Sequence, residues 1–190
     1  GETPLFEGLT FQLREGERLE LRGRNGAGKT TLIRAILQAK DKQKSATLLE
    51  GDLFAEPSMS VGTYEQEISK KYLQTPLLEA IELLYREKGL GITTQKVMQL
   101  LSDYLFNPSQ DGQLLVSQLS GGQKARLQLI SMLATSPQLL ILDEPTNHLD
   151  LPSIEQLETA LHNFSGAVLF VSHDGYFRQA VGGTVLKVGA

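Results

Sequence analysis

An eight-residue run, Gly23-Arg-Asn-Gly-Ala-Gly-Lys29-Thr30, constrains the fold more than any other part of this chain. Its glycines, lysine and threonine occupy the fixed positions of the pattern G-x-x-x-x-G-K-[ST]. Leu19 and Leu21 alternate before it as in a half-buried strand, and apolar residues recur with helical spacing after it, from about Lys29 to Ala39. A strand, a glycine-rich turn and a helix in this order predict one βα unit of an α/β sheet.

The same run predicts a turn that binds phosphate. Glycines let the backbone curl until successive N–H groups face one centre, and the following helix adds the positive end of its dipole. Lysine in such a turn meets the β- and γ-phosphates of a nucleotide, and a hydroxyl can ligate Mg²⁺. We expect the nucleotide to be contacted by the following residues: Asn25, Gly26, Ala27, Gly28, Lys29, Thr30 and Thr31.

Two uninterrupted apolar runs, Leu139 to Leu142 and Ala167 to Val171, predict strands buried on both faces, as in parallel sheets. Asp143 and Glu144 follow the first run directly. Since ligands of open α/β sheets bind beyond the carboxyl ends of the strands, both carboxylates are placed for chemistry. We expect Asp143 to hold Mg²⁺ and Glu144 to orient or deprotonate an attacking water.

The remaining patterns predict a β-rich opening and a helical insert. Apolar residues on odd positions from Leu5 to Leu13 predict half-buried strands, and further short strands are expected at 47–49 and 58–64. Helices are expected from Thr75 as cap with Pro76 in the first turn, from Thr93 or Thr94, and from Ser120 to about Thr135. A further helix is expected to start with Asp150 and Pro152 and to end near Phe164 and Gly166. The prediction is one α/β domain with a mostly parallel sheet, an antiparallel β subdomain, a core of about 1–70 and 119–190, and a helical subdomain of about 71–118.

The composition excludes several kinds of protein. The chain has no cysteine, so disulfides, thiolate nucleophiles and cysteine-ligated zinc are impossible. No apolar run approaches the roughly 18 residues that would predict a membrane span, so any work at a membrane would need a partner. A net charge of −4 gives no strong global attraction to nucleic acid or anionic lipid. These features are compatible with the cytoplasm, where we expect the protein.

Further segments, together with the phosphate turn and the acidic strand end, resemble the motifs of ATP-binding cassette (ABC) ATPases, which have a P-loop NTPase core. They occur in the order of that family. They are the signature-like Leu119-Ser120-Gly121-Gly122-Gln123-Lys124-Ala125-Arg126, the Q-loop-like Gln66, the switch-like His173 in Val171-Ser-His173-Asp174, and the D-loop-like Asn147-His-Leu-Asp150.

The resemblance implies Mg-ATP hydrolysis by two cassettes that pair head to tail with ATP between them. The signature of one cassette would then bind the γ-phosphate of ATP held by the other, because a helix N-terminus exposes N–H groups to anions. The residues implied in trans are Ser120, Gly121, Gly122 and Gln123; the catalytic residues are Glu144, His173 and Gln66; and the Mg²⁺ ligands are Thr30, Gln66 and Asp143. Asp150 would communicate across the pair.

The segments 144–150 and 120–126 look most like those of the ABC-F subfamily, soluble proteins with two cassettes in one chain. Many of them act on the ribosome in translation, and some protect it from antibiotics. Transporter cassettes more often have Ser-Ala-Leu-Asp where Asn147-His-Leu-Asp150 stands. We therefore interpret the chain as one cassette, the second, of a tandem pair, with the ribosome as partner by resemblance. Two alternatives stay open: the ATPase subunit of a membrane transporter, and a module that uses ATP to change shape with negligible turnover.

Overall fold

The structure is a computed structural model that describes residues 8–40, 52–53, 55–56, 58–64, 67–147 and 149–189. The chain divides into two compact units. We call residues 1–61, 137–144 and 164–190 the core unit, and residues 62–136 and 145–163 the helical unit. The segment 71–118, predicted to be helical, falls within the helical unit, which also takes in residues on both sides of it.

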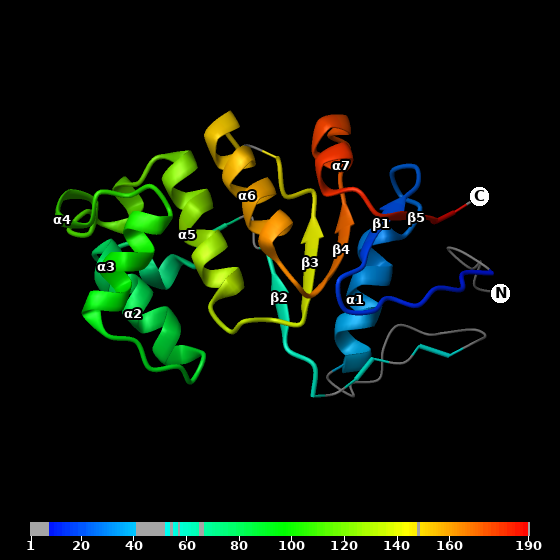
Figure 1. Ribbon diagram of the computed structural model, residues 1–190, viewed down its shortest axis with the longest axis horizontal. Helices are drawn as coiled ribbons and strands as arrows, with labels where there is room; N and C mark the ends of the chain where they lie inside the picture. The colour runs from blue at the N-terminus through cyan, green and yellow to red at the C-terminus, as the bar shows by residue number, and fades with distance from the viewer. Residues whose placement is uncertain are drawn as a thin grey trace. The chain divides into compact units, whose positions relative to one another are not determined.

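The core unit is built on parallel strands (Figure 1). Its strands are β1 (Arg18–Arg22), β3 (Leu139–Asp143), β4 (Ala167–Val171) and β5 (Thr184–Lys187). In the described part of the chain the strand order is β2-β3-β4-β1-β5. The first residue of β2 (Val61–Thr63), Val61, ends the core-unit segment 1–61, and the other two residues of β2 belong to the helical unit. β1 pairs in parallel with β4 and β5, and β3 pairs in parallel with β4. The two buried parallel strands predicted from the apolar runs are confirmed.

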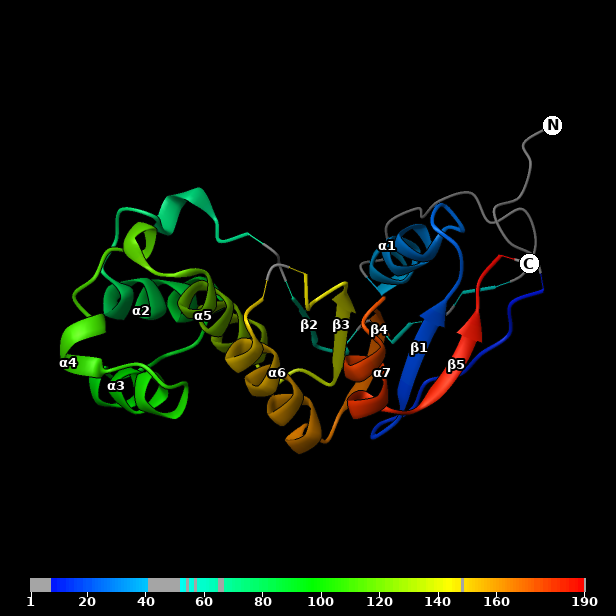
Figure 2. The same ribbon diagram turned by 90° about the horizontal axis from the view of Figure 1, so that it is seen from above.

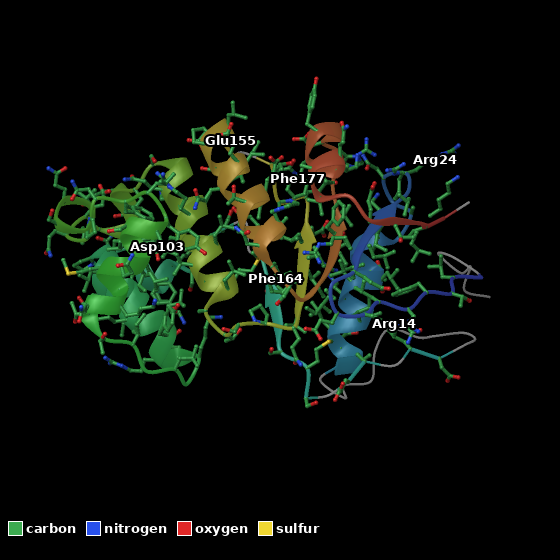
Figure 3. All side chains as sticks on the ribbon, in the orientation of Figure 1. Arg14, Arg24, Asp103, Glu155, Phe164 and Phe177 are labelled. Carbon is green, nitrogen blue, oxygen red and sulfur yellow. The ribbon has the colours of Figure 1, made fainter. Side chains whose placement is uncertain are left out.

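Alternate residues of these strands serve two different helices. Leu19, Ile141 and Leu169 belong to the cluster that includes the apolar face of α1 (Lys29–Lys40). On the other face Phe170 meets Phe177 of α7 (Gly175–Val181) edge to face, with ring centroids 6.0 Å apart. Figure 2 shows α1 and α7 on opposite sides of the sheet, and Figure 3 labels Phe177. Because helices cover both faces of these strands, neither face is exposed to solvent, and the strands therefore consist of unbroken apolar runs.

The helical unit contains η1 (Lys70–Tyr72), α2 (Leu77–Glu87), α3 (Thr94–Asp103), α4 (Pro108–Asp111), η2 (Val116–Gln118), α5 (Gly121–Leu133) and α6 (Leu151–Asn163). α2 packs against α3 and α5, and α5 packs against α6. Leu77, Ile81, Val97 and Leu101 are fully buried between these helices. Among the described residues, none of the helices combines the length and apolar character that crossing a membrane requires.

The predicted start of α2 is wrong in detail. Pro76, not Thr75, is the N-cap residue, and no side chain caps this helix. The first backbone N–H groups are satisfied instead by the loop that follows α4: Leu77 N donates to Leu114 O at 2.8 Å, and Leu78 N donates to Gly112 O at 3.1 Å. Residues distant in sequence thus replace the local cap. The predicted helix starts at Thr93 or Thr94 and at Ser120 are confirmed: α3 begins at Thr94, and Thr93 and Ser120 are the N-cap residues of α3 and α5.

The antiparallel opening is wrong for residues 8–15, which form no strand. Leu9, Phe11 and Leu13 nevertheless pack against the core cluster. Alternating apolar residues need only an extended backbone with one buried side, and a strand needs a hydrogen-bonded partner as well. Residues 1–7 and the strand predicted at 47–49 lie outside the described residues.

Candidate functional site

Three strands of the core unit bring the predicted phosphate and catalytic residues to one edge of the sheet. The glycine-rich turn follows β1, Asp143 ends β3 and Glu144 follows it, and His173 follows β4. Because these strands are parallel and Asp143 is in register with Val171, their carboxyl ends meet. This is the position where open α/β sheets bind ligands.

The phosphate turn adopts a backbone that its glycines permit. Gly26 and Gly28 have φ values of 81° and 89°, a region that residues with a side chain rarely occupy. Ala27 N donates to Arg24 O at 3.1 Å and closes the turn. Lys29 is buried, and its Nζ donates to Gly23 O at 2.8 Å and to Arg24 O at 3.0 Å. An ammonium group has one further proton, which leaves Lys29 able to bond a phosphate oxygen.

The donors next to Lys29 suit a small hard cation. Thr30 Oγ1 donates to Asp143 Oδ2 at 2.9 Å, so a hydroxyl and a carboxylate from residues 113 positions apart lie side by side. Mg²⁺ is usually held by one or two protein oxygens together with phosphates and waters. In the described residues no group of three or more His, Asp and Glu side chains could hold a metal alone. Thr30 and Asp143 therefore fit a Mg²⁺ ion that arrives with a nucleotide.

Glu144 is held in an unusual backbone conformation. Its φ is 49°, which is strained for a residue with a side chain, and its N–H donates to Val171 O at 2.9 Å. Its Oε2 accepts the backbone N–H of His173 at 3.0 Å. Its Oε1 lies 3.2 Å from His173 Nε2 but is buried and makes no hydrogen bond of good geometry. A buried carboxylate oxygen without a hydrogen bond is an acceptor available to a water molecule.

His173 is placed by the start of α7. Asp174 caps that helix, and its Oδ1 accepts Tyr176 N at 2.9 Å and Phe177 N at 3.1 Å. Asp174 N donates in turn to Ser172 Oγ at 3.1 Å. These bonds hold both neighbours of His173, whose own side chain is 63% exposed. The exposed imidazole, whose Nε2 lies 3.2 Å from Glu144 Oε1, can therefore turn toward a ligand while the backbone N–H of His173 stays bonded to Glu144.

A pocket of about 350 Å³ lies where these residues meet. It is lined by Asn25, Gly26, Gly28, Lys29, Thr30, Thr31, Asp143, Glu144, Val171 and His173. Ala27 is the one residue of the predicted phosphate contacts that does not line it. The structure therefore brings together most of the core-unit residues that the sequence singled out.

The signature residues lie in the helical unit, at the N-terminus of α5. Ser120 is the N-cap, and its Oγ accepts Gln123 N at 3.2 Å. Gln123 Oε1 accepts Ser120 N at 3.0 Å in return, which completes a capping box. The Nε2 of Gln123 donates to Asp111 Oδ1 at 3.3 Å. Gln123 is thus engaged inside the unit, whereas Ser120 and Gly121 are exposed.

Gly122 and Asp150 lie in contact within the helical unit. A Cβ atom at Gly122 would be 2.5 Å from Asp150 Oδ2 and 2.9 Å from Oδ1, so any side chain there would force the Asp150 carboxylate to move. Asp150 also accepts Ser153 N at 3.1 Å and caps α6, while the buried Ser153 hydroxyl lies 3.4 Å from Gly122 O. Hydrogen bonds from Ser153 lower the pKa of Asp150, and Arg126 adds a smaller effect in the same direction.

One predicted site residue, Gln66, lies outside the described part of the chain, as does His148 of the D-loop-like segment. Sequence reasoning missed Asp111, Ser153 and the capping role of Asp174. Asp174 and Asp150 each stand just before a helical pattern, which is a readable signal. No sequence signal marks Asp111, because its contact with Gln123 depends on tertiary structure. A larger pocket, of about 410 Å³, lies in the helical unit, and no predicted site residue lines it.

Comparisons with known proteins agree with these motifs. The profile of the family described as ABC transporter matches residues 6–147. The putative ATP-binding protein YdiF of Bacillus subtilis is 37% identical over 189 residues, which cover 100% of this chain and 28% of that protein. The ribosome protection protein VmlR of Bacillus subtilis is 36% identical over 179 residues, 94% of this chain and 30% of that protein.

ABC transporter F family member 5 of Arabidopsis thaliana is 34% identical over 190 residues, 97% of this chain and 25% of that protein. Among solved structures, the ATP-binding subunit of an ABC transporter superposes with a TM-score of 0.75 at 19% identity, covering 97% of this chain and 80% of that one. The structural likeness shows the fold. The chain spans less than a third of the length of these three relatives, 28%, 30% and 25%.

Proposed function

Because the chain belongs to the ABC transporter family and is an ATP-binding cassette of that family, we propose that it binds Mg-ATP in the core-unit pocket and hydrolyses it when two cassettes pair. One observation carries the proposal: Lys29, Thr30, Asp143, Glu144 and His173, from three strand ends, line a single pocket. A phosphate turn, two oxygen ligands and a carboxylate beside a histidine are the parts that phosphoryl transfer to water requires.

Each residue has a role that its contacts support. Lys29 and the N–H groups of the turn bind the β- and γ-phosphates. Thr30 and Asp143 would hold Mg²⁺, which bridges phosphate oxygens and neutralises developing charge when bound. Glu144 accepts a hydrogen bond from the attacking water through Oε1, the oxygen without a hydrogen bond, and His173 reaches the γ-phosphate from its exposed position.

The signature adds the second half of the site from another cassette. Ser120 and Gly121 form an exposed helix start followed by the buried Gly122, and the N–H groups of the first helical residues, Gly121 and Gly122, have no partner within the helix. Such an end attracts a phosphate, and the chain's own phosphate turn is a separate nest. ATP bound to one cassette would therefore be closed by the signature of the other.

Light scattering of Glu144→Gln with and without Mg-ATP tests this proposal. The amide keeps the shape of the side chain but removes the base, so ATP should persist and the mass should double from 20.9 kDa. Glu155→Gln is a matched control, because Glu155 is an exposed residue of α6 labelled in Figure 3; this control should not trap a dimer.

If the Glu144→Gln chain does not bind ATP, the proposal that the core-unit pocket is the ATP site is rejected. A Glu144→Gln chain that binds ATP and still remains a monomer would show that the second cassette must be supplied by a different segment or protein. Mixing that variant with the sister cassette of the natural protein would then be the decisive measurement, and no association there would reject the paired site.

We further propose that the natural protein containing this chain acts on the ribosome. The support is the likeness to F family members and to a ribosome protection protein, together with Asn147 and Asp150 in the D-loop-like segment. Co-sedimentation of its Glu144→Gln form with bacterial ribosomes in ATP should exceed that in ADP. Equal sedimentation in both nucleotides would contradict this role.

A further inference from the structure

The side-chain amide of Gln123 is held at both ends inside the helical unit. Its Oε1 accepts Ser120 N at 3.0 Å, and its Nε2 donates to Asp111 Oδ1 at 3.3 Å. The second oxygen of Asp111, Oδ2, accepts the backbone N–H of Asn107 at 2.7 Å. Both carboxylate oxygens therefore have a donor, one from the start of α4 and one from the signature.

These contacts fix which end of the Gln123 amide faces Ser120 and which faces Asp111. An ionised carboxylate accepts hydrogen bonds and donates none, so Asp111 fixes Nε2 as the end of Gln123 that faces it. The opposite end, Oε1, must then face the N–H of Ser120, which is the bond that completes the capping box. Reversing the amide would place two donors against each other at Ser120.

We propose that Asp111 is a positioning residue for the signature: it orients Gln123 so that the Ser120 N–H is bound internally and only the hydroxyl of Ser120 and the N–H groups of Gly121 and Gly122 remain for phosphate. The inference rests on the proposed role of the signature in trans. It also makes Gln123 a residue that shapes the site, since its amide is engaged on both sides.

Asp111→Asn tests this polarity with almost no change in size. If the new amide group faces Asn107, two N–H donors meet there. If it faces Gln123, the Gln123 amide must reverse and two donors meet at Ser120. Either orientation removes one hydrogen bond from an exposed helix start, Asn107 N–H or Ser120 N–H, at a net cost of about 1 kcal/mol, so we expect Tm to fall by roughly 2–4 °C.

Gln123→Glu with Asp111→Asn restores the pattern by exchanging the two groups. The introduced glutamate can accept both the Ser120 N–H and the amide of the introduced asparagine, whose oxygen still accepts Asn107 N. Gln123→Glu alone opposes two carboxylates and should also lower Tm. The double variant should recover at least half of the summed loss, a reciprocity that a purely steric role of Asp111 would not produce.

Asp103→Asn is the matched control. Asp103, labelled in Figure 3, is exposed and accepts Gln99 Nε2 at 2.7 Å on the surface of α3, so it forms an aspartate–glutamine pair without a link to the signature. Its replacement should change Tm by less than about 1 °C, since exposed side-chain pairs contribute little.

Thermal unfolding of these variants is measured without nucleotide, so it does not depend on the proposed function. Additive losses in the double variant, or an Asp111→Asn chain as stable as wild type, would overturn the inference. In the Glu144→Gln background, Asp111→Asn should also weaken ATP-driven association roughly tenfold while ATP binding by the core unit is unchanged. If Tm shows the rescue but association is unaffected, Asp111 orients Gln123 without positioning the signature for phosphate, and the functional part of the inference is rejected.

Discussion

The phosphate region of the core unit and the signature region of the helical unit both bind phosphate in our proposal, yet they are built in opposite ways. In the core unit, backbone conformations are unusual at Gly26, Gly28 and Glu144, and one carboxylate oxygen of Glu144 is buried without a hydrogen bond. In the helical unit, Ser120 and Gln123 form a regular helix start whose side chains bond one another.

The difference separates two ways of preparing a site. In the core unit, the strained backbone of Glu144 and its carboxylate oxygen without a hydrogen bond lie where the chemistry is proposed. Such features persist because the packing of the surrounding sheet keeps them in place. The helical unit satisfies its polar side chains internally and leaves only backbone N–H groups and a hydroxyl exposed. We therefore expect substitutions in the first region to affect ligand binding, and substitutions in the second to affect local stability first.

The largest expected effect is the loss of nucleotide binding in Lys29→Ala. The phosphates lose a charge-assisted hydrogen bond, and the carbonyls of Gly23 and Arg24 lose their donor, so affinity for Mg-ATP should fall roughly 10- to 100-fold. Titration calorimetry measures it. Lys88→Ala, at the exposed end of α2, is the control and should bind as wild type. Wild-type affinity in Lys29→Ala would remove this contrast between the two regions.

A smaller effect is expected from Gly122→Ala, now on stability. The new Cβ would meet the Asp150 carboxylate at 2.5 Å, so Asp150 must move and the cap of α6 weakens, at a cost of about 1 kcal/mol. Gly121→Ala is the control, because nothing lies within 4 Å of the position that its methyl group would take and alanine favours a helix. Urea unfolding should rank Gly122→Ala below both wild type and Gly121→Ala; the reverse order would contradict the contact.

The smallest effect concerns Tyr64, in the helical unit, and appears only in alkali. Burial raises the pKa of Tyr64 from 10.0 to about 12. The unfolded chain thus loses this proton first, and the stability that Tyr64 contributes is complete below pH 10 and declines as pH rises toward 12. Tyr64→Phe should flatten that part of the stability curve and leave the neutral range nearly unchanged. An equally steep decline in the variant would exclude Tyr64 as its source.

Local patterns in the sequence determined several features of this protein. The phosphate turn, the buried strands 139–142 and 167–171, and the helix starts near Thr93 and at Ser120 were all predicted, because each depends on residues within a few positions of one another. The resemblance to ABC cassettes rested on the same local runs. Parallel strands then explain why the phosphate turn, Asp143, Glu144 and His173 share one pocket.

Only the tertiary structure decided the rest. The loop carbonyls that cap α2, the contact of Asp150 with Gly122, and the bond from Gln123 to Asp111 join segments that no sequence period relates. Segment 8–15 gives the opposite case: its alternating apolar residues predicted a strand, but the segment is not hydrogen-bonded into one. Periodicity reports which side chains are buried, whereas hydrogen-bond partners depend on where distant backbone and side-chain atoms come to lie after packing.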